Sequence, residues 1–402
     1  MYTVIPFIGR SRELSILVEA IKPHGIPSRS LLFIVGPSGI GKTRLTLESI
    51  NRLIASGFKI PYISLTKSYS DVEGALEDFI NQANIFIKEN MSAYKKVVRE
   101  LSSVLRTIDL ETGLFSIRLG VGRESTLGLF NDIIYDLSRI VCSKDYGAIV
   151  IDELQNLLRL YSSWSPRNLI KSLIDIQEYM CSGRLRFVFI TSDFLFRERV
   201  LMDNPVEYFV TFYLGEMTYD DTVSLIKEVF NRYGVVLDRE DVIEDIAMVI
   251  GGSPMIIQVL ADLAKTRGLT WAIKFLVYNA IEDLRSKVYM ATTRYSVDIK
   301  LFIEKVVDDI VEEPIDSSDI IRYPELHSVV KKLIEYNILQ YAPRECVGVY
   351  KWNKISGEIA PLTVIAPSTR TYLYALCRIA GRESSACMDI GSCFKKVVNR
   401  PI

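Results

Sequence analysis

Apolar runs alternate with amphipathic stretches through the first half of the chain. Short, mostly apolar runs predict buried strands. Stretches with apolar residues at helical spacing predict helices between them. The expected strands cover residues 31–35, 58–65, 147–151, 185–190 and 208–214. The expected helices cover residues 11–22, 42–54, 71–90, 92–105, 125–141 and 166–180, and residues 113–122 form a hairpin or a loop. This alternation predicts an α/β fold, with a parallel sheet and helices on both faces.

The strand signal stops after residue 215, where the pattern becomes helical. Helical periodicity covers residues 220–232, 240–250, 255–267 and 271–287, which predicts a small helical lid domain. Further helices are expected at 297–311, 317–321 and 325–336, strands at 338–341, 347–353 and 361–366, and a last helix at 369–379. Three helices followed by a hairpin is the order of a winged helix. The predicted domains are residues 1–215, with a helical insert at about 66–125, then 216–292 and 293–402 with a C-terminal tail.

The composition is that of an ordinary globular protein. The 402 residues carry a formal net charge of −1, with 24% charged and 49% hydrophobic residues. This balance means that any nucleic-acid surface must be local. No apolar stretch approaches the roughly 20 residues that cross a membrane, and the N-terminus lacks a signal-peptide pattern. We therefore expect a cytoplasmic protein with no membrane partner.

The cysteines are scattered and form no Cys-x-x-Cys pair. They stand at positions 142, 181, 346, 377, 387 and 393, and His24 and His327 are the only histidines. This pattern does not predict a zinc site. Free thiols in a reducing cytosol are the favoured interpretation, and a disulfide within the cluster Cys377, Cys387 and Cys393 is the alternative.

The most specific motif lies between the first predicted strand and the helix that follows it. Residues 36–43 read Gly-Pro-Ser-Gly-Ile-Gly-Lys-Thr, the pattern Gly-x-x-x-x-Gly-Lys-Thr of a phosphate-binding P-loop. The loop residues expected to cradle a nucleotide are Gly36, Pro37, Ser38, Gly39, Ile40, Gly41, Lys42, Thr43 and Arg44. Lys42 is expected to reach the β- and γ-phosphates, and the Thr43 hydroxyl to bind Mg²⁺.

A second motif follows the strand at 147–151, where Asp152 and Glu153 emerge. Asp152 is the candidate Mg²⁺ ligand, and Glu153 is the candidate base that polarises the attacking water. The alternative is a buried strand that ends in two solvated acids. Thr191 and Ser192 end the next strand, where they sense the γ-phosphate or simply cap the strand end.

Two shorter motifs support a resemblance to a known family. Residues 7–14 read Phe-Ile-Gly-Arg-Ser-Arg-Glu-Leu, and Gly252-Ser253-Pro254 precedes a predicted helix. With these motifs the chain resembles the archaeal-type STAND ATPases, which are AAA+-related P-loop ATPases. It is also similar to the origin-recognition initiator ATPases, but the arginine-bearing motif of their helical domain is missing here.

The resemblance implies roles for several residues. Ile8 and Gly9 would border the adenine of ATP, and Arg10 would support that pocket or an interdomain contact. Pro254 would lie against the nucleotide, although a helix beginning at a proline is the simpler interpretation. Surface charge at a helix start is the alternative for Arg10 and Arg12.

The chain departs from the family at residues 204–210, where the expected Tyr-Gly-Arg element is absent. Arg197 or Arg199 is then the candidate arginine finger, supplied in cis or by a neighbour in a homo-oligomer of the ATP state. Solvated helix charges are the alternative for both.

The predicted winged helix carries candidate phosphate contacts for duplex DNA. They are Lys331, Lys332, Arg344, Lys351, Lys354 and Arg370. Acidic residues nearby leave the region almost neutral. Tyr350 and Trp352 alternate with lysines, where they stack on nucleic acid or pack inside the module.

The leading functional hypothesis is an ATP-hydrolysing molecular switch. Mg-ATP at the interface of the α/β and helical domains would control the position of the winged helix. The alternatives are a DNA-binding AAA+-type ATPase related to replication initiators or transposition helpers, and a nucleotide-binding scaffold that does not hydrolyse ATP.

Overall fold

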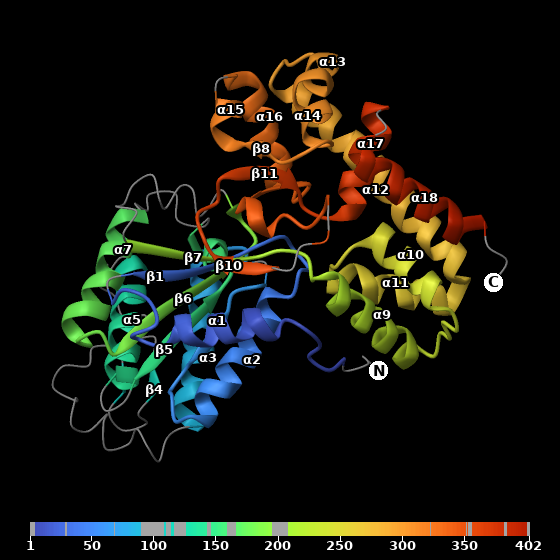
Figure 1. Cartoon of the computed structure of the whole chain (residues 1–402). Coiled ribbons are helices and arrows are strands. Elements are labelled where there is room, and N and C mark those ends of the chain that lie inside the picture. Colours follow the sequence, from blue (N-terminus) through green and yellow to red (C-terminus); the bar gives the residue numbers. More distant parts are fainter. Residues whose placement is uncertain are drawn as a thin grey trace. The chain divides into compact units, whose positions relative to one another are not determined.

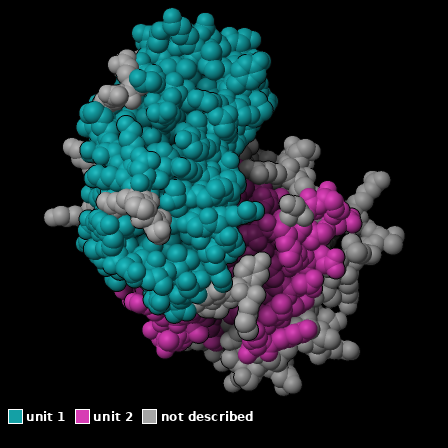
Figure 2. Space-filling model, turned by 90° about the vertical axis from the view of Figure 1, so that its right-hand side faces the viewer, with its two compact units in different colours: residues 1–13, 35–44, 213–402 teal, residues 14–34, 45–212 magenta. Residues whose placement is uncertain are grey.

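The computed structural model describes most of the chain. It covers residues 5–28, 30–67, 69–89, 108–109, 114–115, 126–142, 146–158, 166–194, 208–321, 323–350, 352, 356–381 and 384–399. The helix expected at 92–105 and the candidate residues Arg197, Arg199, Lys351 and Lys354 lie outside these ranges. The chain forms two compact units, coloured separately in Figure 2: unit 1 holds residues 1–13, 35–44 and 213–402, and unit 2 holds residues 14–34 and 45–212.

A mainly parallel sheet forms the core of unit 2 (Figure 1). Its strands are β1 (Leu31–Val35), β2 (Tyr62–Ser64), β5 (Gly147–Asp152), β6 (Leu185–Thr191) and β7 (Phe209–Leu214), in the spatial order β7-β1-β6-β5-β2. The pairings β2–β5 and β5–β6 are parallel, with Val150 opposite Tyr62 on one side and Val188 on the other. Strands β1, β5 and β6 are buried along their whole length, as expected for parallel strands covered on both faces.

The helices of this α/β part follow the predicted alternation. They are α1 (Ser11–Ile21), α2 (Lys42–Ala55), α3 (Val72–Glu89), α5 (Thr126–Cys142), α6 (Gln155–Leu158) and α7 (Pro166–Asp175), and a π-helical turn continues α7 over Ile176–Met180. Helix α3 packs on β2, and α5 packs on β5 and β6. A short hairpin pairs β3 (Ile108–Asp109) with β4 (Leu114–Phe115), so it begins before the position expected for it.

A buried arginine fixes the loop that leads into β1. Arg186 lies on β6 and donates hydrogen bonds to the carbonyls of Pro23, Ile26, Pro27 and Ser30. Burial lowers the pKa of its guanidinium to about 10, which leaves it charged at neutral pH. The four carbonyls replace the water that this cation loses, and these hydrogen bonds attach the loop before the P-loop strand to β6.

The helical part of unit 1 matches its prediction closely. It consists of α9 (Tyr219–Tyr233), α10 (Glu240–Ile250), α11 (Pro254–Arg267) and α12 (Leu269–Arg294). Helix α11 packs against α9 and α12, and α10 packs against α9. Helix α12 is longer than expected, because its apolar face continues through the buried residues Val288 and Ala291.

Three helical segments and a three-stranded sheet follow. The segments are the run α13 (Ile299–Phe302), π-helical turn Ile303–Val307 and α14 (Asp308–Ile310), then α15 (Ser317–Ile321) and α16 (Pro324–Glu335). The antiparallel sheet has the order β8-β11-β9, with β8 (Ile315–Asp316), β9 (Leu339–Ala342) and β11 (Val364–Pro367). Helices α17 (Arg370–Ala380) and α18 (Ser385–Asn399) end the chain. Helix α18 packs on α10 and was missed by the prediction, which ended the helices at residue 379.

The strand expected at 347–353 is wrong for the residues that the structure describes there. A 3-10 turn at Arg344–Cys346 is followed by irregular backbone. The Tyr350 hydroxyl bonds the Ile310 carbonyl at 2.5 Å, and Trp352 Nε1 lies 3.1 Å from Met248 Sδ. The aromatic residues therefore pack inside unit 1 instead of alternating along a wing. The next segment, β10 (Gly357–Ile359), is the edge strand beside β7 in the large sheet.

The expectation of free thiols is wrong for four of the six cysteines. Cys142 pairs with Cys181, and Cys377 pairs with Cys387, at Cα–Cα distances of 5.6 and 5.9 Å. Cys346 and Cys393 are free. The first pair joins residues 39 apart in the chain, so their proximity follows from packing and no local pattern reveals it. Within the described ranges, no helix has the length and apolar character needed to cross a bilayer.

Candidate functional site

The P-loop lies between β1 and α2, as its sequence predicts. Gly39 and Gly41 have φ angles of +76° and +96°, which glycine adopts without strain. A methyl group on Gly36 would collide with the carbonyl oxygen of Leu214, so this position also requires glycine. The motif glycines therefore shape a close-fitting turn ahead of a helix N-terminus, the arrangement that binds phosphate groups through backbone N–H groups.

The two functional side chains of the P-loop differ in exposure. The Lys42 side chain is buried, and its ammonium donates to the carbonyls of Gly36 and Pro37, each at 2.8 Å. Thr43 and Arg44 are exposed in the first turn of α2, as is Ser38 in the loop. Lys42 thus lies folded along the loop, and phosphate oxygens would take the place of these two carbonyls as its acceptors.

The first turn of α11 packs on the P-loop within unit 1. The backbone N–H of Met255 donates to the Gly39 carbonyl at 3.3 Å, and the Ser253 hydroxyl donates to the same oxygen at 3.4 Å. A methyl group on Gly41 would lie 3.7 Å from Cγ of Pro254. Pro254 is the first residue of α11, so the interpretation as a helix start is confirmed, and the predicted contact with the nucleotide stays a prediction.

Arg10 is buried, which excludes the surface-charge interpretation for this residue. Its guanidinium donates to the carbonyls of Ile40 and Gly215 at 3.1 and 2.8 Å, and to the Ser356 hydroxyl at 3.2 Å. Its backbone N–H donates to Asp221 Oδ2 at 2.8 Å, beside the partly exposed Gly9 and Ile8. Burial lowers its pKa to about 10, so the cation persists at neutral pH. Arg10 therefore supports the P-loop from behind.

Asp152 ends β5 and is fully buried, so it is not a solvated acid. The Tyr62 hydroxyl, at the start of β2, donates to Asp152 Oδ2 at 2.8 Å. Burial and the Asp152 charge raise the pKa of Tyr62 well above its usual range, so this donor keeps its proton. The prediction did not include Tyr62, because its sequence neighbours carry no motif.

Glu153 follows Asp152 in a backbone conformation that is rare for its residue type. Its φ is +60°, in the left-handed region, and its N–H donates to the Ile190 carbonyl at 2.9 Å. The Ser192 hydroxyl donates to Glu153 Oε1 at 3.3 Å, and the Gln155 amide donates to Oε2. A strained residue that the surroundings hold in place is a frequent mark of a functional site.

The two polar residues at the end of β6 have different surroundings. Ser192 lies next to Glu153, as described above. Thr191 is buried, and its hydroxyl accepts the N–H of Asp193 at 2.9 Å, which is a local strand-end cap. The structure therefore brings Ser192 and Glu153 together and gives Thr191 a structural contact.

The candidate DNA contacts in the C-terminal region are largely engaged in internal contacts. Arg370 is buried, donates to the Gly348 carbonyl at 3.2 Å, and lies 4.3 Å from the centre of the Trp352 ring. Lys332 pairs with Glu335 and lies 5.1 Å from the Tyr336 ring centre. The prediction of a phosphate contact is therefore wrong for Arg370, whose charge is enclosed by protein. Lys331 and Arg344 stay predictions.

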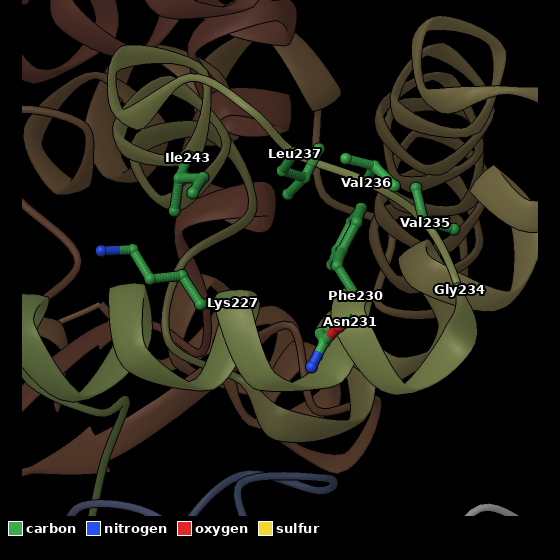
Figure 3. Close-up of a pocket in the computed structure, with 8 residues that line it drawn as sticks. All are labelled: Lys227, Phe230, Asn231, Gly234, Val235, Val236, Leu237 and Ile243. Atoms are coloured by element: carbon green, nitrogen blue, oxygen red, sulfur yellow. The ribbon is translucent and has the colours of Figure 1, made fainter.

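A separate pocket of about 220 Å³ lies along α9 (Figure 3). It is lined by Lys227, Phe230, Asn231, Gly234, Val235, Val236, Leu237 and Ile243. None of these eight residues belongs to the predicted nucleotide site. Lys227 there pairs with Glu240 at 2.7 Å.

The donor set suits Mg-ATP. Backbone N–H groups of a glycine loop and the Lys42 ammonium match phosphate oxygens. A threonine hydroxyl and a carboxylate are the oxygen ligands that Mg²⁺ prefers. Thr43 in unit 1 and Asp152 in unit 2 stay the predicted ligands of the metal, which would neutralise phosphate charge.

Comparison with known proteins gives the family. Residues 7–260 match the model of a family described as an ATPase domain predominantly from Archaea. The chain belongs to this ATPase family. The match covers both the P-loop and the Asp-Glu motif, and it confirms the predicted resemblance to archaeal, AAA+-related P-loop ATPases.

The chain is also similar to solved structures. The Walker-type ATPase PABY2304 of Pyrococcus abyssi superposes with a TM-score of 0.55 at 15% identity, over 92% of this chain and 96% of that one. The Aeropyrum pernix ORC2 protein, solved as ADPNP-ADP complexes, gives a TM-score of 0.49 at 14% identity, over 98% of this chain and 97% of that one. No curated protein sequence matches significantly. The first likeness shows the shared fold of this ATPase.

Proposed function

We propose that the ATPase binds and hydrolyses Mg-ATP and acts as a nucleotide-dependent molecular switch. Lys42 binds the β- and γ-phosphates, and Thr43 and Asp152 hold Mg²⁺. Glu153 polarises the attacking water, and Ser192 orients the Glu153 carboxylate. The reaction consumes water and releases ADP and inorganic phosphate.

The observation that carries this proposal is the conformation of Glu153. A nucleotide-binding scaffold that does not hydrolyse ATP has no need for a strained acid at the end of β5. Here the left-handed backbone costs about 1–3 kcal/mol and is maintained by hydrogen bonds to the Glu153 side chain from Ser192 and Gln155. An acid aimed by neighbouring side chains favours general-base catalysis over a passive scaffold.

The switch part of the proposal rests on α11. The P-loop contacts Ser253, Pro254 and Met255 at the start of this helix. A bound nucleotide shifts a conformational equilibrium only through contacts that differ between its states. Because α11 packs on α12, and α12 packs on α16 and α17, a change at the P-loop has a packed route to the C-terminal elements. We propose these C-terminal elements, predicted as a winged helix, as the moving module.

DNA binding by that module, an arginine finger from Arg197 or Arg199, and a homo-oligomer stay predictions. The enclosed Arg370 removes one of the contacts on which the DNA hypothesis depended.

The experiment that tests the proposed function is steady-state ATP hydrolysis, measured by phosphate release with and without Mg²⁺. We expect turnover that requires Mg²⁺ and disappears in Lys42→Ala. Turnover that is unchanged by Lys42→Ala would mean that the P-loop is not the site of ATP hydrolysis. Absence of turnover in a wild-type protein that binds Mg-ATP would favour the scaffold hypothesis.

A further inference from the structure

A strand from the C-terminal part of the chain reaches the P-loop through Arg10. Ser356, just before β10, is buried and accepts a hydrogen bond from the Arg10 guanidinium at 3.2 Å. The same guanidinium donates to the Ile40 carbonyl at 3.1 Å. One side chain thus joins residue 356 to the middle of the phosphate-binding loop, and all three residues belong to unit 1.

The network around Ser356 is specific and fully buried. The Ser356 hydroxyl and N–H both donate to Glu13 Oε1, at 2.8 and 3.1 Å. Its carbonyl accepts the Gly215 N–H at 2.7 Å, beside the Gly215 carbonyl that Arg10 bonds. Because the Ser356 hydroxyl donates its hydrogen bond to Glu13, the Ser356 oxygen presents a lone pair to Arg10.

Residues on both sides of Ser356 strengthen this attachment. Arg12 donates to the Gly357 carbonyl at 2.9 Å and pairs with Glu358. A methyl group on Gly357 would lie 3.0 Å from the Tyr213 carbonyl oxygen, so the strand fits closely against the end of β7. The motif Gly9-Arg10-Ser11-Arg12-Glu13 therefore provides three side chains that hold β10.

The contact with Ile40 has a consequence for phosphate binding. In a planar trans peptide the carbonyl of one residue and the N–H of the next point in opposite directions. Arg10 holds the Ile40 carbonyl, so it also fixes the direction of the Gly41 N–H. Gly41, one of the two residues that flank this peptide unit, has a positive φ and few steric limits, so the unit rotates more easily than one between two residues with side chains unless something holds it.

The geometry points to Arg10, Glu13 and Ser356 as positioning residues for the nucleotide. Together they fix the direction of the Gly41 N–H for phosphate binding. Through them, the position of β10 affects the conformation of the phosphate-binding loop. Nucleotide binding at the P-loop and packing of β10 beside β7 then stabilise each other, since coupling between two binding events is reciprocal. This inference rests on the proposed nucleotide binding by the P-loop.

The test compares Ser356→Ala with Ser384→Ala. Ser384 is a matched control, because it is also buried in unit 1 and its hydroxyl donates to a carbonyl, that of Val311, at 3.1 Å. Calorimetric titration with ATPγS and Mg²⁺ measures the dissociation constant, and thermal unfolding measures stability. Loss of a hydrogen bond to a charged group predicts an affinity about tenfold weaker in Ser356→Ala. The control is expected to keep the wild-type affinity at a similar loss of thermal stability.

Hydrogen exchange on the wild-type protein gives a readout independent of any variant. We expect ATPγS with Mg²⁺ to slow exchange of the amides in residues 357–359 at least about tenfold. Unchanged exchange there, in a protein that binds the nucleotide, would overturn the inference. Equal affinities of wild type and Ser356→Ala would overturn it as well. A wild-type protein without measurable affinity for the nucleotide would overturn the proposed function together with the inference.

Discussion

The nucleotide-binding loops and the C-terminal region use their polar residues in different ways. Around the P-loop, Ser38, Thr43 and Arg44 stay exposed at the start of a helix that has no acidic residue in its first turn. In the C-terminal region, Arg370 is enclosed by Trp352 and the Gly348 carbonyl, and Lys332 pairs with Glu335. A cation at a plausible position is therefore no measure of ligand binding. What differs here is exposure to solvent: Arg44 at the start of α2 is exposed, whereas Arg370 is buried.

The largest expected effect is on nucleotide affinity. Lys42→Ala removes the buried ammonium that phosphate oxygens would take over from two carbonyls, and we expect affinity for Mg-ATP to fall about 1,000-fold, or about 4 kcal/mol. Arg52→Ala is the control, because Arg52 lies on the same helix and pairs only weakly with Glu48 at 3.8 Å. Titration with a fluorescent ATP analogue measures both. Similar affinities for the two variants would remove the P-loop from the binding site.

The C-terminal side of the comparison predicts a loss of stability. Arg370→Ala removes a buried cation that holds Trp352 and the Gly348 carbonyl, so we expect the free energy of unfolding to fall by about 3 kcal/mol. Lys395→Ala on the exposed surface of α18 is expected to cost about 0.5 kcal/mol or less. Urea unfolding monitored by circular dichroism measures both values. If Arg370→Ala proves as stable as Lys395→Ala, the enclosed environment described for Arg370 is incorrect.

A buried carboxyl beside Arg370 predicts pH-dependent stability. The Glu216 carboxylate accepts a hydrogen bond from the backbone N–H of Arg370 at 3.2 Å, and burial raises the pKa of Glu216 from 4.5 to about 7. Between these values the folded protein binds more protons than the unfolded chain, so this carboxyl favours folding at low pH and loses that contribution as pH rises through 7. Glu216→Gln stays uncharged, and we expect it to gain roughly 2 kcal/mol over wild type at pH 8 and little at pH 4.5.

Urea unfolding at a series of pH values measures the free energy of unfolding of wild type and Glu216→Gln and tests this prediction. A constant difference between the two proteins across pH 4.5–8 would mean that Glu216 does not titrate in this window.

The smallest expected effect separates the two residues at the end of β6. Ser192→Ala leaves Glu153 Oε1 without its hydroxyl donor, and we expect kcat to fall about fivefold, from the loss of one hydrogen bond. Thr191→Ala removes a local cap and is expected to change kcat by about twofold or less. Steady-state kinetics of both variants at saturating ATP are the measurement. The reverse order would make Thr191 the residue that acts on the reaction.

Local patterns predicted most of the elements that carry the site. The apolar runs at 31–35, 147–151 and 185–190 became strands that end at Val35, Asp152 and Thr191, and helix α10 was predicted with its observed bounds. These features depend on residues adjacent in sequence or one helical turn apart, so periodicity reveals them. The P-loop glycines are also recognisable from the sequence, because the backbone conformation of the loop requires glycine at fixed spacings.

Contacts between distant residues escaped prediction. Arg10 meets Ser356 across 346 positions, and Tyr62 meets Asp152 across 90. A hydrogen bond at such separation has no periodic signature, and a surface arginine and a buried one look the same in the sequence. The strand prediction for residues 347–353 was wrong for a related reason. Its alternating aromatics suit a strand, but Tyr350 and Trp352 instead bond Ile310 and Met248, which lie far away in the chain.

The central claim is that the P-loop and the Asp-Glu motif act on the same nucleotide, and Glu153→Gln tests it most directly. The variant and the wild type are incubated with ATP and Mg²⁺, separated from free nucleotide, and the retained nucleotide is identified by chromatography. We expect the wild type to retain ADP and Glu153→Gln to retain uncleaved ATP, with affinity within about twofold of wild type and turnover reduced about 100-fold. Retention of ADP by Glu153→Gln at the wild-type turnover rate would contradict the account.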